Sequence, residues 1–139
     1  MNTADPLFHK PKSIIASKNI SYATIFLGIV LLFINEINAG FDVSLKRYIL
    51  LTGAIMVAVL FLITKQIGLG RKWARMAFVV FFIFEAALIS FFLLRVFNSN
   101  LFINVVLIAI AVLHILVLRF LFLLKSTEWF NSVGSTITG

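Results

Sequence analysis

Two ionisable residues inside long apolar segments are the strongest candidates for chemistry in this sequence. Glu85 interrupts the apolar segment 74–97, and His114 interrupts the apolar segment 101–124. Each segment is long enough to cross a membrane as a helix, for which about 20 apolar residues are needed. An ionisable side chain inside such a helix is rare, because hydrocarbon offers it no water, and it marks a functional site by default.

The two residues are expected to lie at the same depth. Glu85 stands eleven positions into its segment, and His114 stands ten residues before the end of the next one. At about 1.5 Å per residue, both lie roughly 15 Å deep, near the midplane of a hydrocarbon core about 30 Å thick. We therefore predict a buried ionisable pair on neighbouring helices. Two interpretations stay open: a proton-linked or ligand-binding pair, and a polar contact that fixes helix packing.

The rest of the sequence offers few groups for catalysis. It has no cysteine, and its second histidine, His9, lies in the N-terminal tail. Dedicated metal sites need clusters of Cys, His and carboxylate side chains, so we expect none. Gly68 and Gly70 lack the Gly-Lys-Ser/Thr ending of a phosphate loop. We predict a protein that is not an enzyme, has no catalytic residues and carries no cofactor.

Composition excludes a soluble domain. Of the 139 residues, 62% are hydrophobic and 12% are charged, whereas soluble domains have about 45–50% and about 25%. Four apolar segments are long enough to cross a bilayer, and they cover residues 19–35, 48–64, 74–97 and 101–124. Hydrocarbon gives the backbone no hydrogen-bond partner, so each segment must be a helix. We predict an all-α polytopic membrane protein, with residues 1–139 forming a single membrane domain, an antiparallel bundle of four transmembrane helices.

The distribution of Lys and Arg predicts the orientation. Nine of these residues fall on one side of the predicted bundle, and three, Lys46, Arg47 and Arg95, fall on the other. Basic loops stay in the cytoplasm, so we expect a multi-pass protein of the cell inner membrane with both termini inside. The net charge of +7 suits the bilayer and its anionic inner-leaflet lipid as partners. No basic stretch is long enough to favour nucleic acid.

Several residues at the helix boundaries are candidates for binding at the membrane surface. Arg71, Lys72 and Arg75 stand within little more than one helical turn, and Arg119 lies near the end of the fourth segment. We predict that these four cations bind lipid headgroups or a partner protein. Trp73 and Trp129 are predicted interface anchors, because an indole ring can stay in the acyl region while its N–H reaches the headgroups.

The first segment carries a face suited to helix packing. Small and polar residues recur on it at spacings of three and four: Ser21, Thr24, Gly28 and Asn35, with Leu31 between the last two. In lipid, helices associate through close backbone approach and through polar contacts. We therefore interpret this face as a contact with a neighbouring helix.

Three short motifs resemble a group of small bacterial inner-membrane proteins of uncharacterised function. Residues 70–75 read Gly-Arg-Lys-Trp-Ala-Arg, residues 10–13 read Lys-Pro-Lys-Ser, and residues 126–130 read Ser-Thr-Glu-Trp-Phe. In that group, a Gly-Arg/Lys-x-Trp-Ala-Arg segment joins the second and third of four helices. The resemblance implies a bacterial four-helix membrane protein and brings no catalytic residues.

These observations favour a non-enzymatic accessory or interaction protein that recognises a membrane partner or lipid. The partner could be another membrane protein or a second copy of the chain. The alternative is a small proton-coupled carrier or channel that uses Glu85 and His114. A third hypothesis is a toxin-immunity-type membrane protein. Fold class does not decide among the three.

Overall fold

The computed structural model describes residues 10–37, 43–96 and 101–136, and these residues form five α-helices without any strand. The helices are α1 (Lys12–Ile37), α2 (Val43–Gly68), α3 (Lys72–Val96), α4 (Leu101–Leu121) and α5 (Leu124–Thr136). The first four are long and apolar enough to cross a membrane. The predicted all-α fold class of a multi-pass membrane protein is therefore confirmed.

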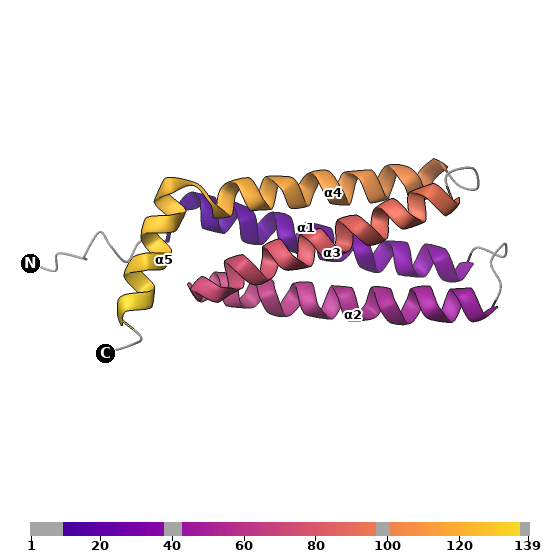
Figure 1. Cartoon of the computed structure of the whole chain (residues 1–139), viewed down its shortest axis with the longest axis horizontal. Coiled ribbons are helices and arrows are strands. Elements are labelled where there is room, and N and C mark those ends of the chain that lie inside the picture. The colour runs from indigo at the N-terminus through magenta and orange to yellow at the C-terminus, as the bar shows by residue number, and fades with distance from the viewer. Residues whose placement is uncertain (1–9, 38–42, 97–100, 137–139) are drawn as a thin grey trace, which may run out of the picture.

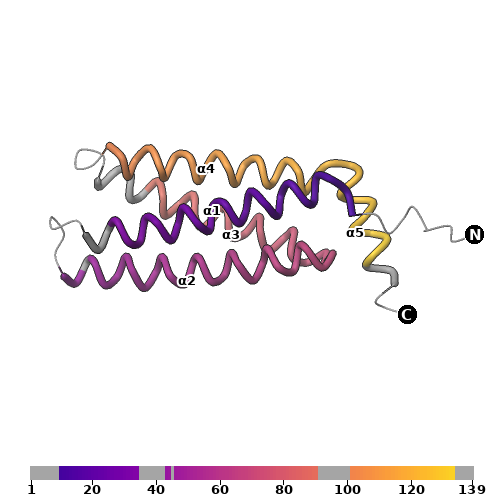
Figure 2. The backbone as a smooth tube through the Cα atoms, turned by 180° about the vertical axis from the view of Figure 1, so that it is seen from behind, coloured from indigo at the N-terminus to yellow at the C-terminus, as the bar shows by residue number. Residues whose placement is uncertain are grey.

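The four long helices lie side by side, and each runs in the opposite direction to the one before it (Figure 1). Helix α1 lies between α2 and α4 and packs closely against both (Figure 2). Helix α3 contacts α2 and α4 less extensively. The short helix α5 lies across one end of the bundle, which we call the α5 end (Figure 1).

Glycine sets the register between α1 and α2. A Cβ atom on Gly28 of α1 would lie 3.2 Å from Cγ2 of Val57 on α2, and a Cβ on Gly53 would collide with the side chain of Leu32. Both glycines therefore allow the two backbones to approach closely, as small residues do between helices in lipid.

Helix α1 is longer than its apolar stretch. It begins at Lys12, because the carbonyl of Pro11 accepts hydrogen bonds from the N–H groups of Ile14 and Ile15, at 3.0 and 3.3 Å. The added first turns carry Ser13 and Ser17. The apolar stretch of the sequence therefore indicates the part of α1 that lies in hydrocarbon. Backbone hydrogen bonds extend the helix beyond that stretch.

Helix α5 was not part of the predicted bundle. Its residues Ser126 and Thr127 connect it to the other helices: Ser13 and Ser126 share a hydrogen bond of 2.7 Å between their hydroxyls, and Arg75 donates to Thr127 at 3.1 Å. Ser126 also donates to the carbonyl of Phe120, at 2.7 Å. These polar contacts hold α5 against the ends of α1, α3 and α4.

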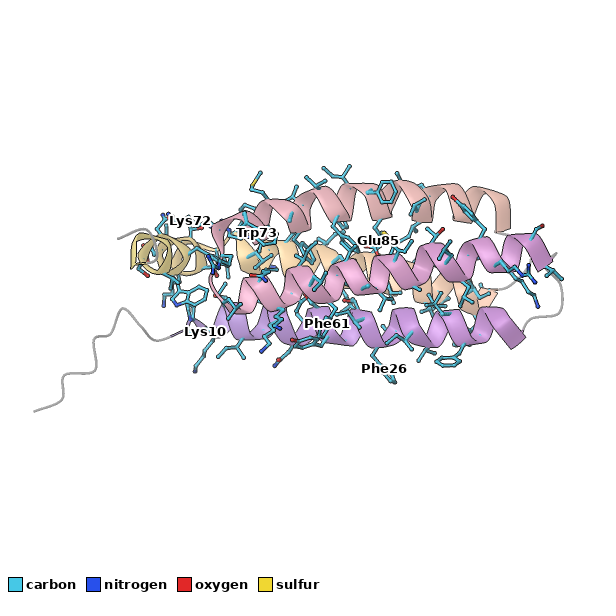
Figure 3. The ribbon with its side chains drawn as sticks, turned by 90° about the horizontal axis from the view of Figure 1, so that it is seen from below. Lys10, Phe26, Phe61, Lys72, Trp73 and Glu85 are labelled. Atoms are coloured by element: carbon cyan, nitrogen blue, oxygen red, sulfur yellow. The ribbon has the colours of Figure 1, made fainter. Side chains whose placement is uncertain are left out.

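The apolar side chains divide into a core and an outer surface. Ile14, Ile67, Phe78, Val117 and Leu121 are almost completely buried near the α5 end. Many large apolar side chains instead face outward along the four long helices, including Phe26 and Phe61 (Figure 3). An outer surface of this kind suits contact with lipid.

Candidate functional site in the middle of the bundle

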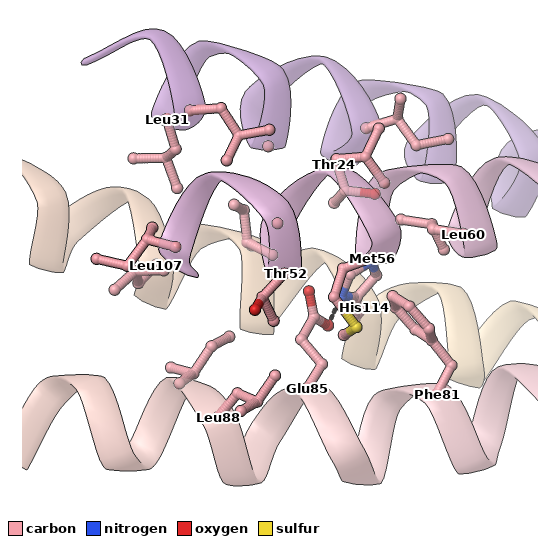
Figure 4. Close-up of a pocket in the computed structure, with 18 of the residues that line it drawn as sticks. Thr24, Leu31, Thr52, Met56, Leu60, Phe81, Glu85, Leu88, Leu107 and His114 are labelled. Atoms are coloured by element: carbon pink, nitrogen blue, oxygen red, sulfur yellow. Dashed lines mark ion pairs between the residues drawn. The ribbon is translucent and has the colours of Figure 1, made fainter. Parts of the chain in front are cut away.

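Glu85 and His114 meet between α3 and α4. Oε2 of Glu85 lies 2.5 Å from Nδ1 of His114, so the carboxyl group and the imidazole are in direct contact (Figure 4). His114 is fully buried, and the side chain of Glu85 is 16% exposed. The structure thus brings together the two residues whose depths match in the sequence.

Aromatic rings from α3 surround the imidazole. Phe78, Phe81 and Phe82 pack edge to face with the ring of His114, with centroids 5.5, 6.0 and 6.5 Å away. They come from one stretch of α3 and lie within two turns of Glu85. These rings exclude water from one side of the pair and fix the plane of the imidazole.

A cavity of about 200 Å³ adjoins the pair and is lined by all four long helices. Most of its walls are aliphatic, and its polar residues are Thr24, Thr52, Glu85, Asn104 and His114. Figure 4 shows Glu85 between Thr52 and His114, with its carboxyl group facing away from α3. The cavity is therefore an apolar chamber that has a carboxyl–imidazole pair in its wall.

The cavity reaches from the pair toward the end opposite α5. Leu31, Ile49 and Ile103 line its far part, whereas Leu60 and Phe81 line the part beside His114. Beyond that level, toward the α5 end, the buried core of the bundle follows. The chamber thus extends from the pair into one half of the bundle.

The predicted packing face of α1 lies partly on this cavity. Ser21 and Thr24 are buried, and Gly28 faces α2 at Val57. Thr24 donates a hydrogen bond to the carbonyl of Ser21, at 2.8 Å, and both Thr24 and Gly28 line the chamber. The side chain of Asn35 falls outside the described residues. One face of α1 therefore serves both helix packing and the cavity wall.

The four predicted headgroup-binding cations have different environments. Arg71, Lys72 and Arg119 are exposed. Arg75 instead faces α5, where its guanidinium lies 4.6 Å from the ring centre of Phe122 and 5.1 Å from that of Phe130. Arg75 is thus engaged within the protein.

The two predicted interface anchors also differ. Trp73 is 56% exposed near the α5 end, beside Lys72 (Figure 3). Trp129 is 8% exposed and packs on Phe130, with ring centres 5.1 Å apart. Lys10 lies over the Trp129 ring at 5.5 Å and donates to the carbonyl of Gly68 at 2.6 Å. Trp129 therefore forms part of the junction between α5 and the bundle.

Sequence reasoning did not single out Thr52, which lines the cavity, or Thr64, which is fully buried on α2. The sequence did contain a signal for both residues, because each is a polar side chain within an apolar segment. Threonine is common at contacts between membrane helices, so a single threonine in the sequence indicates helix packing rather than a ligand site. Within residues 10–37, 43–96 and 101–136, no three His, Cys, Asp or Glu side chains gather closely enough to hold a metal ion.

Comparison with known proteins gives no matching family model, no matching curated protein and no matching solved structure. Function therefore has to be inferred from the geometry of the bundle and its cavity.

Proposed function

We propose that this chain is a non-enzymatic protein of the bacterial inner membrane that binds a small, uncharged amphiphile from the bilayer. The cavity between the four helices carries this proposal, because its walls are apolar and a hydrogen-bonding pair lies beside it. Sites for small molecules commonly combine apolar walls with a few polar groups that orient the ligand. Both termini and α5 face the cytoplasm in this proposal, as the basic loops predict.

The size of the chamber limits the ligand. An engineered apolar cavity of about 150 Å³ holds one benzene molecule. A cavity of about 200 Å³ therefore suits a single ring or a short alkyl segment, with a hydroxyl group that donates a hydrogen bond to the carboxyl group of Glu85. The ligand is uncharged, because a charge buried between apolar walls without a partner would be costly.

The exposed cations give the protein a second contact with lipid. Arg71 and Lys72 follow the turn between α2 and α3, and Arg119 lies in the last turn of α4. On the cytoplasmic side they would bind anionic headgroups, each contributing about 1 kcal/mol. These contacts hold the protein in the inner leaflet and leave the cavity free for its ligand.

A second candidate function is a proton-coupled carrier. The observation that favours it is the contact between Glu85 and His114, since a carboxyl–imidazole contact can exchange a proton between Oε2 and Nδ1 when a ligand enters. Its described lining residues place the cavity in the half of the bundle opposite α5. A carrier would require a second conformation that opens toward the α5 end.

Two fluorinated probes test ligand binding. The full chain is placed in lipid nanodiscs, and binding of 4-fluorophenol and fluorobenzene is followed by fluorine NMR against empty nanodiscs. We expect saturable binding of 4-fluorophenol, about 3–10-fold tighter than that of fluorobenzene, because one hydrogen bond contributes about 0.5–1.5 kcal/mol.

A pair of matched variants locates the binding site. Leu107→Phe adds a ring at the cavity wall, whereas Leu51→Phe makes the same change at a side chain that is 64% exposed on the outer surface. Binding should be lost in Leu107→Phe and unchanged in Leu51→Phe. Equal binding by the two variants, or no difference between the two probes, would contradict the proposal.

A further inference from the structure

Several buried polar atoms have no hydrogen-bond partner among the described residues, and three of them lie on different long helices. These three are Oγ of Ser21 on α1, Oγ1 of Thr64 on α2 and Nε2 of His114 on α4. None of these atoms takes part in the contact between Glu85 and Nδ1 of His114. A buried polar atom left unsatisfied costs about 1–3 kcal/mol, so native proteins pair such atoms or place water beside them.

The register of α1 and α2 places Ser21 opposite Thr64. Gly28 faces Val57, and Ser21 and Thr64 each lie seven residues from that contact, toward the α5 end. Seven residues make about two turns on either helix. Gly68 faces Lys18 still nearer the α5 end, with 3.6 Å between a Cβ at Gly68 and Cδ of Lys18. The two hydroxyl groups therefore share one level of the interface.

His114 lies near the same level, because it stands six residues before Phe120 on α4, Ser21 stands eight residues after Ser13 on α1, and Ser126 bonds to both Phe120 and Ser13. His114 lines the cavity together with Thr24, which is one turn from Ser21 and donates to the Ser21 carbonyl. Helix α4 packs closely along α1. Nδ1 of His114 is engaged by Glu85 on α3, so Nε2 is the ring nitrogen that has no partner among the described residues. Of the cavity-lining residues described, Glu85 and His114 are the titratable ones.

A row of serine hydroxyl groups on α1 continues from this level to the α5 end. Ser17 and Ser13 follow Ser21 at intervals of four residues on the same face of α1. Ser17 is 1% exposed and donates to the carbonyl of Ile14 at 2.9 Å, and Ser13 contacts Ser126 of α5. Successive hydroxyls lie about 6 Å apart along the helix axis, which is farther than one water spans at about 2.8 Å per hydrogen bond, so a path along this row needs more than one water between neighbouring hydroxyls.

We propose that Ser21, Thr64 and Nε2 of His114 bind an internal water, and that this water and others along the row connect the Glu85–His114 pair to the α5 end through Ser17 and Ser13. A buried water needs two to four polar partners, and three helices supply them here. The pair then exchanges protons with the α5 side, while the ligand cavity extends toward the opposite side. This inference goes beyond ligand binding, because it holds whichever molecule occupies the cavity.

Water contact with His114 is directly measurable. The chain has two histidines, so a His9→Gln background leaves His114 as the single ¹⁵N-histidine signal in solid-state NMR of the full chain in bilayers. Magnetisation transfer from water protons to Nε2 should be present in this parent. It should be lost in the double variant Ser21→Ala with Thr64→Val, which keeps the side-chain volumes and removes both hydroxyl groups.

Two further variants separate loss of water from loss of structure. Ser90→Ala removes an exposed hydroxyl that bonds to its own helix, at 2.8 Å from the carbonyl of Ala86, and should leave the transfer at the parental level. Ser21→Ala with Thr64→Ser restores one hydroxyl and should restore transfer. Absence of transfer in the parent, or its persistence in the double variant without hydroxyls, would overturn the water site.

The path to the α5 end has its own test. In proteoliposomes with one orientation, a pH jump is applied to one face, and the infrared band that disappears in Glu85→Gln reports the state of the pair. We expect a faster response to a jump on the α5 side, and loss of that preference in Ser17→Ala. A faster response from the opposite face, no preference in the parent, or an unchanged preference in Ser17→Ala would overturn the path.

Discussion

Trp129 of α5 packs against Gly70 in the turn between α2 and α3, so closely that a Cβ at Gly70 would lie 3.1 Å from Cη2 of the indole. The same Cβ would lie 2.8 Å from Cγ1 of Val133. Gly70 also has a positive φ of 75°, a conformation that disfavours side chains. Glycine at position 70 therefore permits both the backbone conformation of the turn and the close packing of α5 against it.

Gly70→Ala should release α5 from the bundle. The left-handed conformation alone costs about 1–2 kcal/mol for a residue with a side chain, and the new methyl group adds two close contacts. In a Trp73→Phe background, fluorescence of Trp129 should shift to the red and become open to quenching. Gly68→Ala is the control, because a Cβ there meets ordinary contacts at 3.6 Å. Equal spectra for the two variants would refute this role of Gly70.

The Glu85–His114 pair should couple α3 to α4 energetically. Polar contacts in membrane bundles average about 0.6 kcal/mol and reach about 1.7 kcal/mol in double-mutant cycles, so we expect a coupling of about 0.6–1.7 kcal/mol between Glu85→Leu and His114→Leu. The free energy of unfolding in bicelles, measured by steric trapping, provides the cycle. A second cycle of Ser90→Ala with His114→Leu should give additive effects. Additive effects in the first cycle would show that the pair does not stabilise the bundle.

Lys18 should lower the proton affinity of Lys10. The pKa of Lys10 is below its ordinary value, first because burial disfavours the charged ammonium and second because Lys18 repels it. Removing that repulsion in Lys18→Gln should raise the pKa of Lys10, though not to its ordinary value, because burial remains. Fluorescence of Trp129, whose ring lies under the Lys10 ammonium, can follow the titration in a Trp73→Phe background. An unchanged or lower midpoint would contradict the assignment.

The orientation in the membrane can be tested with reporter fusions. An enzyme that is active only in the cytoplasm should work when fused after Arg71 and fail when fused after Asn38, because basic loops stay inside. A periplasmic reporter at the same positions serves as the reciprocal control. Activity of one reporter at both positions would reject the predicted arrangement of the four spans.

The four membrane helices could be predicted because the bilayer imposes a simple requirement. Each span must be apolar and must satisfy its own backbone, and both properties are visible in the sequence. The shared depth of Glu85 and His114 followed from counting residues along two consecutive helices. Such counting places residues at a depth, and the structure adds the rotation of each helix that turns the two side chains together.

Helix α5 and the cavity could not be predicted in the same way. Residues 124–136 are largely polar, so hydrophobicity gives no signal, and α5 is held by contacts such as Ser13 with Ser126, which lie far apart in the sequence. The cavity exists because the side chains of the four long helices do not fill the space between the helices. Such a volume depends on helix spacing, which no local pattern specifies.

The limited packing of α3 has a consequence for how a ligand enters the cavity. This helix contributes Glu85 to the site, yet it contacts its neighbours less than α1 does. Helix α3 is therefore the most loosely packed wall of the cavity, and a ligand that comes from the acyl chains would enter beside it. A ligand that enters from the bilayer does not cross the aqueous phase, so a molecule that is insoluble in water can also reach the site.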